Sequence, residues 1–196
     1  QLTAQNGLDG LAFAAGIPGT VGGAVCGNAG AFGHDISEVV SKVTVFQGGK
    51  LEVLTNSDLS FAYRSSSLSG QQLLILEVVL SLKAATASKV KAKVQDYLQK
   101  RKKTQPREQL TAGSIFKNPP GLFAGQLIEA CGGKQWQIGG AKVSAQHANF
   151  FINTGQAKAS DFYKLILKAQ KEVYERFKVK LEPEVKFLGD FSAQTS

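Results

Sequence analysis

Four short segments of the sequence hold residues whose types and spacing can do chemistry. The first, residues 16–33, contains seven glycines, at positions 16, 19, 22, 23, 27, 30 and 33. Backbone without side chains lets N–H groups approach a pyrophosphate or a flat ring closely. The segment has neither the GxGxxG pattern of dinucleotide-binding folds nor the Gly-Lys-Ser/Thr of a phosphate-binding loop. A ligand cradle and a cluster of tight turns therefore both remain open.

The second segment is Tyr63-Arg64-Ser65-Ser66, in which an arginine follows an aromatic residue. A guanidinium group can bind a carboxylate through two parallel hydrogen bonds. An arginine that only faces solvent is the alternative interpretation.

The third segment, residues 111–119, places Ser114 after a glycine, with Lys117 and Asn118 close behind. A serine in this setting can act as a nucleophile, a proton donor or a phosphate ligand. No Asp–His pattern accompanies it, which disfavours a hydrolase triad. A capped turn that leads into Pro119 is the alternative.

The fourth segment, Leu181-Glu182-Pro183-Glu184-Val185, carries two carboxylates that can transfer protons, although solvated glutamates are the alternative. His147 can bind a phosphate or another substrate group, or it can be structural. The two cysteines, Cys26 and Cys131, lie far apart and in no metal spacing. With so few ligands we expect no metal site, no disulfide framework and a reducing, cytoplasmic setting.

The elements that must position these segments follow from hydrophobic periodicity. In the first half, residues 39–46 and 51–55 predict two strands of a hairpin around the turn at 47–50. Residues 73–82 are almost continuously apolar and predict a strand buried on both faces. A helix is predicted over residues 89–103, and residues 104–109 read as a linker between two domains.

In the second half, residues 123–131 predict a short helix closed by Gly132 and Gly133, and residues 149–153 predict a strand. Ser160 is a suitable N-cap for a long helix. Its apolar face consists of Phe162, Leu165, Ile166, Ala169, Val173 and Phe177. Residues 179–187 alternate between apolar and charged side chains, which predicts a further strand. Strands interleaved with helices predict an α+β fold.

The chain of 196 residues has a net charge of +8, and eight of its 23 basic residues lie between positions 89 and 107. Such a cluster can attract nucleic acid or steer small polyanions. Tyr97 is the one aromatic residue among them, so a base-stacking platform is lacking and a solvated helix face is favoured. The apolar runs are too short to span a bilayer. We therefore expect neither a nucleic-acid nor a membrane partner.

The order of the motifs is more specific than any one of them. The chain contains, in order, GIPGTVGGAVCGNAGAFG, FAYRSS, TAGSIFKNP, QIGGAKVSAQHANFFIN and LEPEV. This series resembles the UDP-N-acetylenolpyruvoylglucosamine reductase family, in its shorter subclass, over nearly the whole chain.

The resemblance implies the C-terminal part of a vanillyl-alcohol-oxidase-type FAD-binding domain at residues 1–104 and an α+β substrate-binding domain at residues 105–196. It implies FAD as cofactor, NADPH as reductant and a UDP-sugar as substrate, in peptidoglycan precursor synthesis. It also implies that a further N-terminal segment of the same protein supplies part of the flavin site. A truncated, non-catalytic FAD- or nucleotide-binding module is the alternative.

The resemblance also assigns roles to individual residues. Ser114 is implied as the proton donor, with Arg64 and Glu184 stabilising an enolate-like intermediate. Substrate contacts are implied for Tyr63, Lys117, Asn118 and His147. Flavin contacts are implied for Gly19, Thr20, Gly22, Gly23, Ala24, Asn28 and Gly30. The sequence departs from the family pattern at Phe32, where tyrosine is common, and before Pro106, where Thr104 occupies the place of a basic residue.

Overall fold

The computed structural model describes residues 1–106 and 109–191 of the chain. The chain divides into two compact units, Gln1–Arg101 and Lys102–Ser196. Each unit has a hydrophobic core of its own. Arg107, the last member of the basic cluster, lies outside the described residues.

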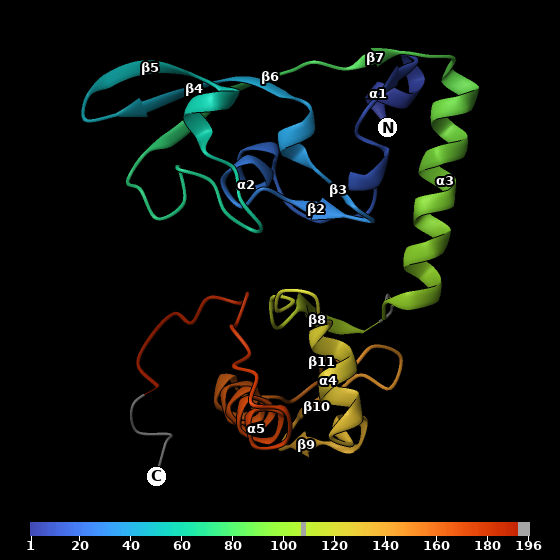
Figure 1. The fold of residues 1–196 in the computed structure, drawn as a ribbon, viewed down its shortest axis with the longest axis vertical. Coiled ribbons are helices and arrows are strands. Elements are labelled where there is room, and N and C mark those ends of the chain that lie inside the picture. The colour runs from blue at the N-terminus through green and yellow to red at the C-terminus, as the bar shows by residue number, and fades with distance from the viewer. Residues whose placement is uncertain (107–108, 192–196) are drawn as a thin grey trace. The chain divides into compact units, whose positions relative to one another are not determined.

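The first unit is built of two short helices, one long helix and three small antiparallel sheets (Figure 1). Its helices are α1 (Leu2–Gln5), α2 (Val21–Cys26) and α3 (Ala87–Thr104), with 3-10 turns at Ala12–Ala14, Ile36–Glu38 and Asn56–Leu59. Its strands are β1 (Leu8–Asp9), β2 (Gly30–Ala31), β3 (His34–Asp35), β4 (Val40–Gln47), β5 (Lys50–Thr55), β6 (Leu74–Leu80) and β7 (Lys83–Ala84). The helix α3 runs through the boundary between the units and ends three residues beyond it.

The predicted hairpin is confirmed. Strands β4 and β5 pair antiparallel from Lys42↔Thr55 to Gln47↔Lys50, so that Gly48 and Gly49 form the turn. Both glycines have positive φ angles, of 58° and 80°. A two-residue turn of this kind matches the right-handed twist of the strands, and glycine adopts it without steric cost.

The prediction for residues 73–82 is only half right. A strand is present, β6, but it lies at the edge of the sheet in the order β5-β4-β6 and is not buried on both faces. Leu74 and Leu76 are 61% and 57% exposed. A continuous apolar run does not reveal which face is covered, because both faces of such a strand have the same composition.

The predicted helix over residues 89–103 is confirmed as the longer α3, with Val90 buried on its packed face. The basic cluster is not uniformly solvated, because Arg101 is also buried. Its guanidinium lies 5.2 Å from the centre of the Phe32 ring, and it donates a hydrogen bond to the carbonyl oxygen of Phe13. Burial lowers the pKa of Arg101.

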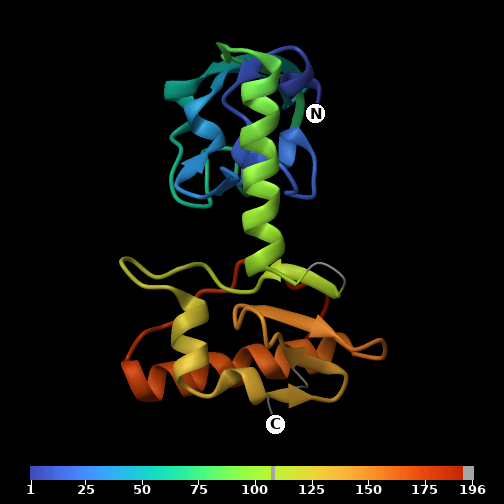
Figure 2. The same ribbon diagram turned by 90° about the vertical axis from the view of Figure 1, so that its right-hand side faces the viewer.

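The second unit places two helices against one antiparallel sheet in the order β8-β11-β10-β9 (Figure 2). The strands are β8 (Leu110–Ser114), β9 (Gln137–Ile138), β10 (Ala141–Val143) and β11 (Phe150–Asn153). The helices are α4 (Ala124–Ala130) and α5 (Ala159–Phe177), with a 3-10 turn at Gly133–Gln135. Buried side chains of α4, α5, β10 and β11 share one core.

Strand β11 and helix α4 confirm the predictions for residues 149–153 and 123–131, and Gly132 follows α4 with a φ of 77°. The N-cap prediction for α5 is wrong. The helix begins at Ala159 with Lys158 as N-cap, because the Asp161 carboxylate accepts a hydrogen bond from the backbone N–H of Lys158. Four of the six residues predicted for its packed face are buried: Leu165, Ile166, Ala169 and Val173.

The predicted strand at residues 179–187 is wrong as well. The segment is extended but irregular, and its one bridge joins Pro183 to Phe116. The alternation is correct in part, since Leu181 is buried and Val179 and Val185 pack against the core. The alternation therefore reflects which side chains reach the core, and not a continuous ladder of backbone hydrogen bonds.

None of the helices in residues 1–106 and 109–191 has both the length and the apolar character needed to cross a bilayer.

Candidate functional site

In the second unit, the residues after Ser114 are paired on both sides. The N–H of Ile115 donates to the carbonyl oxygen of Asn149 at 2.8 Å, which continues the β8–β11 pairing beyond the end of β8. The carbonyl oxygen of Ile115 accepts from the N–H of Glu184 at 2.7 Å. Ile115 therefore links the backbone next to Ser114 with the backbone of Glu184. Residues 111–114 thus belong to strand β8, and not to the capped turn that was the alternative interpretation.

Pro183 fits this pairing because of its position in the register. The flanking hydrogen bonds run from Lys117 N–H to the Glu182 carbonyl, at 2.9 Å, and from Glu184 N–H to Ile115. Phe116 and Pro183 are thus a pair without hydrogen bonds between them. A proline costs nothing in such a place, since no N–H is required.

The backbone groups of Phe116 bind the side chain of Asn149. The N–H of Phe116 donates to Asn149 Oδ1 at 2.9 Å, and Asn149 Nδ2 donates to the Phe116 carbonyl at 2.8 Å. Both residues are buried. Asn149 is not among the site residues predicted from the sequence. Its polar amide between an alanine and an aromatic run, in HANFF, was the available signal.

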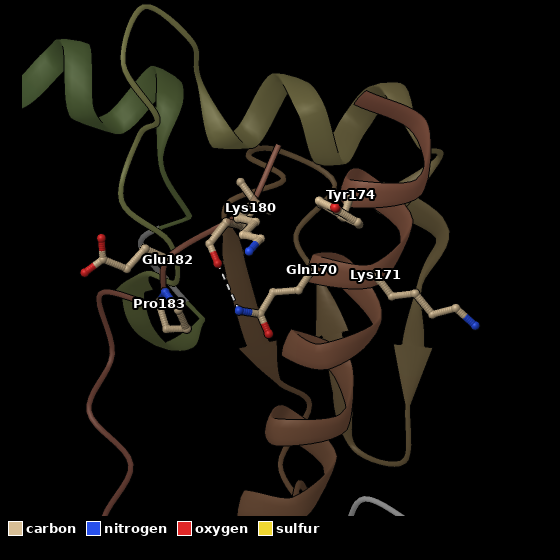
Figure 3. Close-up of a pocket in the computed structure, with 7 residues that line it drawn as sticks. Gln170, Lys171, Tyr174, Lys180, Glu182 and Pro183 are labelled. Carbon is tan, nitrogen blue, oxygen red and sulfur yellow. Dashed lines mark hydrogen bonds between the residues drawn. The ribbon is translucent and has the colours of Figure 1, made fainter. Parts of the chain in front are cut away.

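Helix α5 binds the segment of residues 180–183, which precedes Glu184. Gln170 Nε2 donates to the carbonyl oxygen of Leu181 at 2.9 Å (Figure 3). Gln170 and Glu182 belong to the lining of an open hollow of about 630 Å³ between α5 and residues 180–183. In Figure 3 the Gln170 amide points toward this segment, and the Glu182 carboxylate points away from the helix. The segment that carries Glu184 is thus tied to the core.

Lys117 and Asn118, both expected to contact substrate, have partners within the unit. Lys117 Nζ forms an ion pair with Glu182 Oε1 at 2.5 Å. The Glu182 side chain is 69% exposed, so solvent screens the pair and it contributes little to stability. Asn118 Oδ1 accepts from the N–H of Ala124 at 3.0 Å, which caps the first turn of α4. Their contacts with substrate stay predictions.

His147 lies in the connection between β10 and β11 and is held by contacts with the residues that follow it. Its Nδ1 accepts a hydrogen bond from the N–H of Asn149 at 3.2 Å, which places the proton of the neutral ring on Nε2. The ring packs edge-to-face on Phe150, with centroids 4.9 Å apart. Burial lowers the pKa of His147 below its ordinary value of 6.5.

This lowered pKa predicts that acid destabilises the second unit. Unfolded His147 binds a proton near pH 6.5, whereas the folded ring resists protonation until a lower pH. The stabilisation is therefore complete above pH 6.5 and is lost as the pH falls below it. We expect the free energy of unfolding, measured in urea, to decrease from pH 7 to pH 5.

His147→Asn is the matched control, because the amide oxygen replaces Nδ1 as acceptor and does not titrate in this range. We expect its unfolding free energy to vary less between pH 7 and pH 5. Equal slopes for the two proteins would show that His147 is not the responsible group.

In the first unit, the glycine-rich segment forms α2 and the two loops around it. Thr20 is the N-cap, and its Oγ1 accepts from the N–H of Gly23 at 3.1 Å. Gly19 has a φ of 137° and open space where a Cβ would stand. Gly22 packs near Ile75, and Ala24 lies in the middle of the helix. Val21 and Gly23 are exposed in the first turn of α2, and Gly19 before it leaves space that no side chain fills.

Asn28 joins this segment to the Tyr63-Arg64 turn. Its Nδ2 donates to the carbonyl oxygen of Ala62 at 3.0 Å, and its Oδ1 accepts from the N–H of Ser37 at 3.2 Å. The hydroxyl of Ser66 also donates to the carbonyl of Cys26, at 2.7 Å. The structure therefore gives Asn28 a scaffolding role, and its contact with flavin stays a prediction.

Tyr63 and Arg64 form the tip of a tight turn. Ala62 and Ser65 exchange two backbone hydrogen bonds, of 3.0 and 3.1 Å, on either side of them. Arg64 has a φ of 56°, in the left-handed region that favours glycine. Its guanidinium lies 5.0 Å from the centre of the Tyr63 ring. Strain of this kind at a large side chain is more frequent at functional sites.

Gly30 illustrates a glycine required by packing. A Cβ at this position would lie 2.7 Å from the carbonyl oxygen of His34 and 2.8 Å from the Asp35 Cβ, both on the partner strand β3. We expect Gly30→Ala to lower the unfolding free energy by about 1–3 kcal/mol, because the hairpin must open.

Gly27→Ala is the control, since its Cβ would meet only an ordinary contact at 3.5 Å. Urea unfolding of both variants measures the difference. If Gly30→Ala were as stable as Gly27→Ala, the close β2–β3 packing would be contradicted.

No group of three His, Cys, Asp or Glu side chains suited to holding a metal ion occurs in the part of the chain that the structure describes. The arrangement instead offers a serine and a glutamate on paired segments of one unit. The other unit offers Arg64 on a strained turn, which Asn28 joins to the glycine-rich segment.

Comparisons with known proteins define the family to which this protein of mixed helices and sheets belongs. Residues 105–188 match the family described as UDP-N-acetylenolpyruvoylglucosamine reductase, C-terminal domain. The crystal structure of UDP-N-acetylenolpyruvylglucosamine reductase from Thermus caldophilus superposes with a TM-score of 0.83 at 37% identity, over 94% of this chain and 67% of that one.

Curated relatives agree. The UDP-N-acetylenolpyruvoylglucosamine reductase of Caldicellulosiruptor bescii is 46% identical over 95% of this chain and 60% of its own length. That of Halalkalibacterium halodurans is 45% identical over 95% of this chain and 62% of its own length. The chain belongs to the UDP-N-acetylenolpyruvoylglucosamine reductase family, and it spans about 60% of the length of these relatives.

Proposed function

We propose that the protein reduces the enolpyruvyl group of UDP-N-acetylglucosamine enolpyruvate to give UDP-N-acetylmuramate, a peptidoglycan precursor, with FAD as cofactor and NADPH as reductant. The family supports an oxidoreductase acting on this class of substrate. The observation that carries the proposal is the pairing of the Ser114 segment with the Glu184 segment in the domain that the family match covers.

The glycine-rich segment fits a flavin nucleotide in three respects. Thr20 caps the first turn of α2, and the N–H groups at the start of a helix favour anionic phosphate oxygens. Gly19 leaves space that a side chain would fill. The segment is also held to the Tyr63-Arg64 turn by Asn28. We therefore place FAD on this segment, in a domain of the vanillyl-alcohol-oxidase type.

When bound, FAD supplies a hydride to the methylene carbon of the enolpyruvyl group after it has been reduced by NADPH. The neighbouring carbon then carries negative charge that is delocalised onto the substrate carboxylate. Ser114 Oγ donates its proton to that carbon. Serine is a weak acid in water, but a carbanion is basic enough to accept this proton.

Arg64 and Glu184 act on the same charge. The Arg64 guanidinium neutralises the carboxylate, to which it can present two parallel hydrogen bonds. Glu184 in its protonated form would donate a hydrogen bond, whereas an ionised carboxylate would repel the intermediate. Tyr63, Lys117, Asn118 and His147 hold the substrate in the proposed reaction. Lys117 carries the charge best suited to the diphosphate.

Turnover by the native, full-length protein tests the proposal. We expect NADPH oxidation to depend on the enolpyruvyl UDP-sugar, and the sugar product to gain the mass of two hydrogen atoms. NADPH oxidation that proceeds equally without the UDP-sugar, or a product of unchanged mass, would contradict the proposal. Binding of flavin or UDP-sugar without turnover would favour a non-catalytic module.

A further inference from the structure

Ser114 follows an interruption in its strand. Between Ile152↔Thr111 and Phe150↔Ser114 the register shifts, so β8 carries one residue more than β11 over this stretch. Gly113 lies in the shift with a φ of 85° and no atom within 4 Å of a Cβ position. A bulge of this kind turns the next side chain toward a new direction. Ser114 pairs with Phe150 beyond this shift, so its position depends on the backbone pairing from Ser114 onward.

After Ser114, the backbone N–H and C=O groups of Phe116 are the ones held in place. Ile115 and Lys117, the neighbours of Phe116, make the hydrogen bonds to the segment that contains Pro183. The N–H and C=O groups of Phe116 itself therefore face away from that segment. There the Asn149 amide meets both groups, at 2.9 and 2.8 Å. Phe116 and Asn149 are 1% and 4% exposed, so water does not replace these bonds easily.

The backbone of Asn149 adds two further bonds. Its carbonyl accepts from Ile115 at 2.8 Å, and its N–H donates to His147 Nδ1 at 3.2 Å. Asn149 thus binds backbone groups of the two residues after Ser114, Ile115 and Phe116, while the N–H of Glu184 binds the carbonyl oxygen of Ile115. A backbone shift at Phe116 would move Ser114 and Glu184 relative to each other.

We infer that Asn149 is a positioning residue. Its side chain binds the backbone N–H and C=O groups of Phe116, and this clamp holds Ser114 in place for proton donation. The inference rests on the proposed function, because the role of Ser114 does. A misplacement of about 1 Å can reduce a rate by about 100-fold. Loss of the clamp should therefore slow proton delivery, while hydride transfer from NADPH to the flavin continues.

Asn149→Ala removes both side-chain bonds. In the full-length protein we expect reoxidation of the reduced flavin by the enolpyruvyl UDP-sugar to slow by about 10- to 100-fold. Flavin reduction by NADPH should stay within about twofold of the wild-type rate, since it does not use Ser114. Asn153→Ala is the matched control. It also loses two hydrogen bonds, from the N–H groups of Gly155 and Ala157, but at the far end of β11.

Asn149→Asp separates positioning from folding. Its ionised carboxylate would accept from the Phe116 N–H but would repel the Phe116 carbonyl, and only the protonated acid restores the donor. Burial raises the pKa of such a group. We expect reoxidation by this variant to recover toward the wild-type rate as the pH falls, relative to wild type at each pH. His147, Lys117, Glu182 and Glu184 are the charged or titratable groups that face the same region, and all four are present in both proteins.

Hydrogen exchange of the Phe116 amide tests the clamp without any turnover. We expect faster exchange at Phe116 in Asn149→Ala and unchanged exchange at Phe116 in Asn153→Ala. Unchanged exchange in Asn149→Ala would overturn the clamp, whatever the protein catalyses. Faster exchange with a reoxidation rate within threefold of wild type would overturn the positioning role. Absence of UDP-sugar turnover in the wild type would contradict the proposed function, and with it the role of Asn149 in proton delivery.

Discussion

Replacing Ser114 with alanine should leave reduction of the flavin by NADPH within about twofold of wild type and slow its reoxidation by the UDP-sugar about 10²- to 10⁴-fold, the range for loss of a general acid. The hydroxyl is the group proposed to donate the proton, and only the second half-reaction needs it. Anaerobic stopped-flow absorbance measures the two half-reactions separately.

The fold around Ser114 should tolerate this change. Ile115 and Phe116 are held through backbone groups and Asn149, so the segment does not depend on the hydroxyl. Ser160→Ala is a matched control, because this serine lies in the first turn of α5 and is not its N-cap. Reoxidation of Ser114→Ala at the wild-type rate would show that another group donates the proton.

Arg64→Gly should separate catalysis from stability in the first unit. Glycine adopts the φ of 56° without strain, which offsets the loss of the contact with the Tyr63 ring. We expect an unfolding free energy within about 1 kcal/mol of wild type. Reoxidation by the UDP-sugar should slow by about 10²- to 10³-fold, since a preorganised charge opposite the intermediate is lost.

Arg64→Lys is the companion variant. It keeps the positive charge and loses the planar, two-pronged donor, so an intermediate rate is expected. Urea unfolding and stopped-flow absorbance are measured on both variants. A glycine variant that turns over normally would remove Arg64 from the site. A variant that fails to fold would show that the arginine is structural.

The sequence predicted those elements whose periodicity is unambiguous. The β4–β5 hairpin has a clear glycine turn, and α3, α4 and α5 have helical periodicity, although the N-cap of α5 was predicted two residues too late. The sequence did not predict that residues 179–187 pair with Phe116 at a single point, because the alternation there reflects burial rather than a ladder. It also did not predict β8, whose short, glycine-containing run resembles a turn.

The site was predicted only as separate motifs. The motifs around Ser114 and Glu184 were each visible, but their backbone pairing depends on contacts between distant parts of the chain. Asn149 was missed for the same reason, since a buried asparagine is recognised by its partners and not by its neighbours in sequence. The burial of Arg101 beside Phe32 was likewise hidden inside a run of basic residues.

The most direct test of the proposed function is the absorbance spectrum of the purified full-length protein, recorded anaerobically through one cycle. The proposal predicts an oxidised-flavin spectrum that bleaches when NADPH is added and returns in full when one equivalent of the enolpyruvyl UDP-sugar follows. A flavin that bleaches with NADPH but stays reduced in the presence of this UDP-sugar would contradict it.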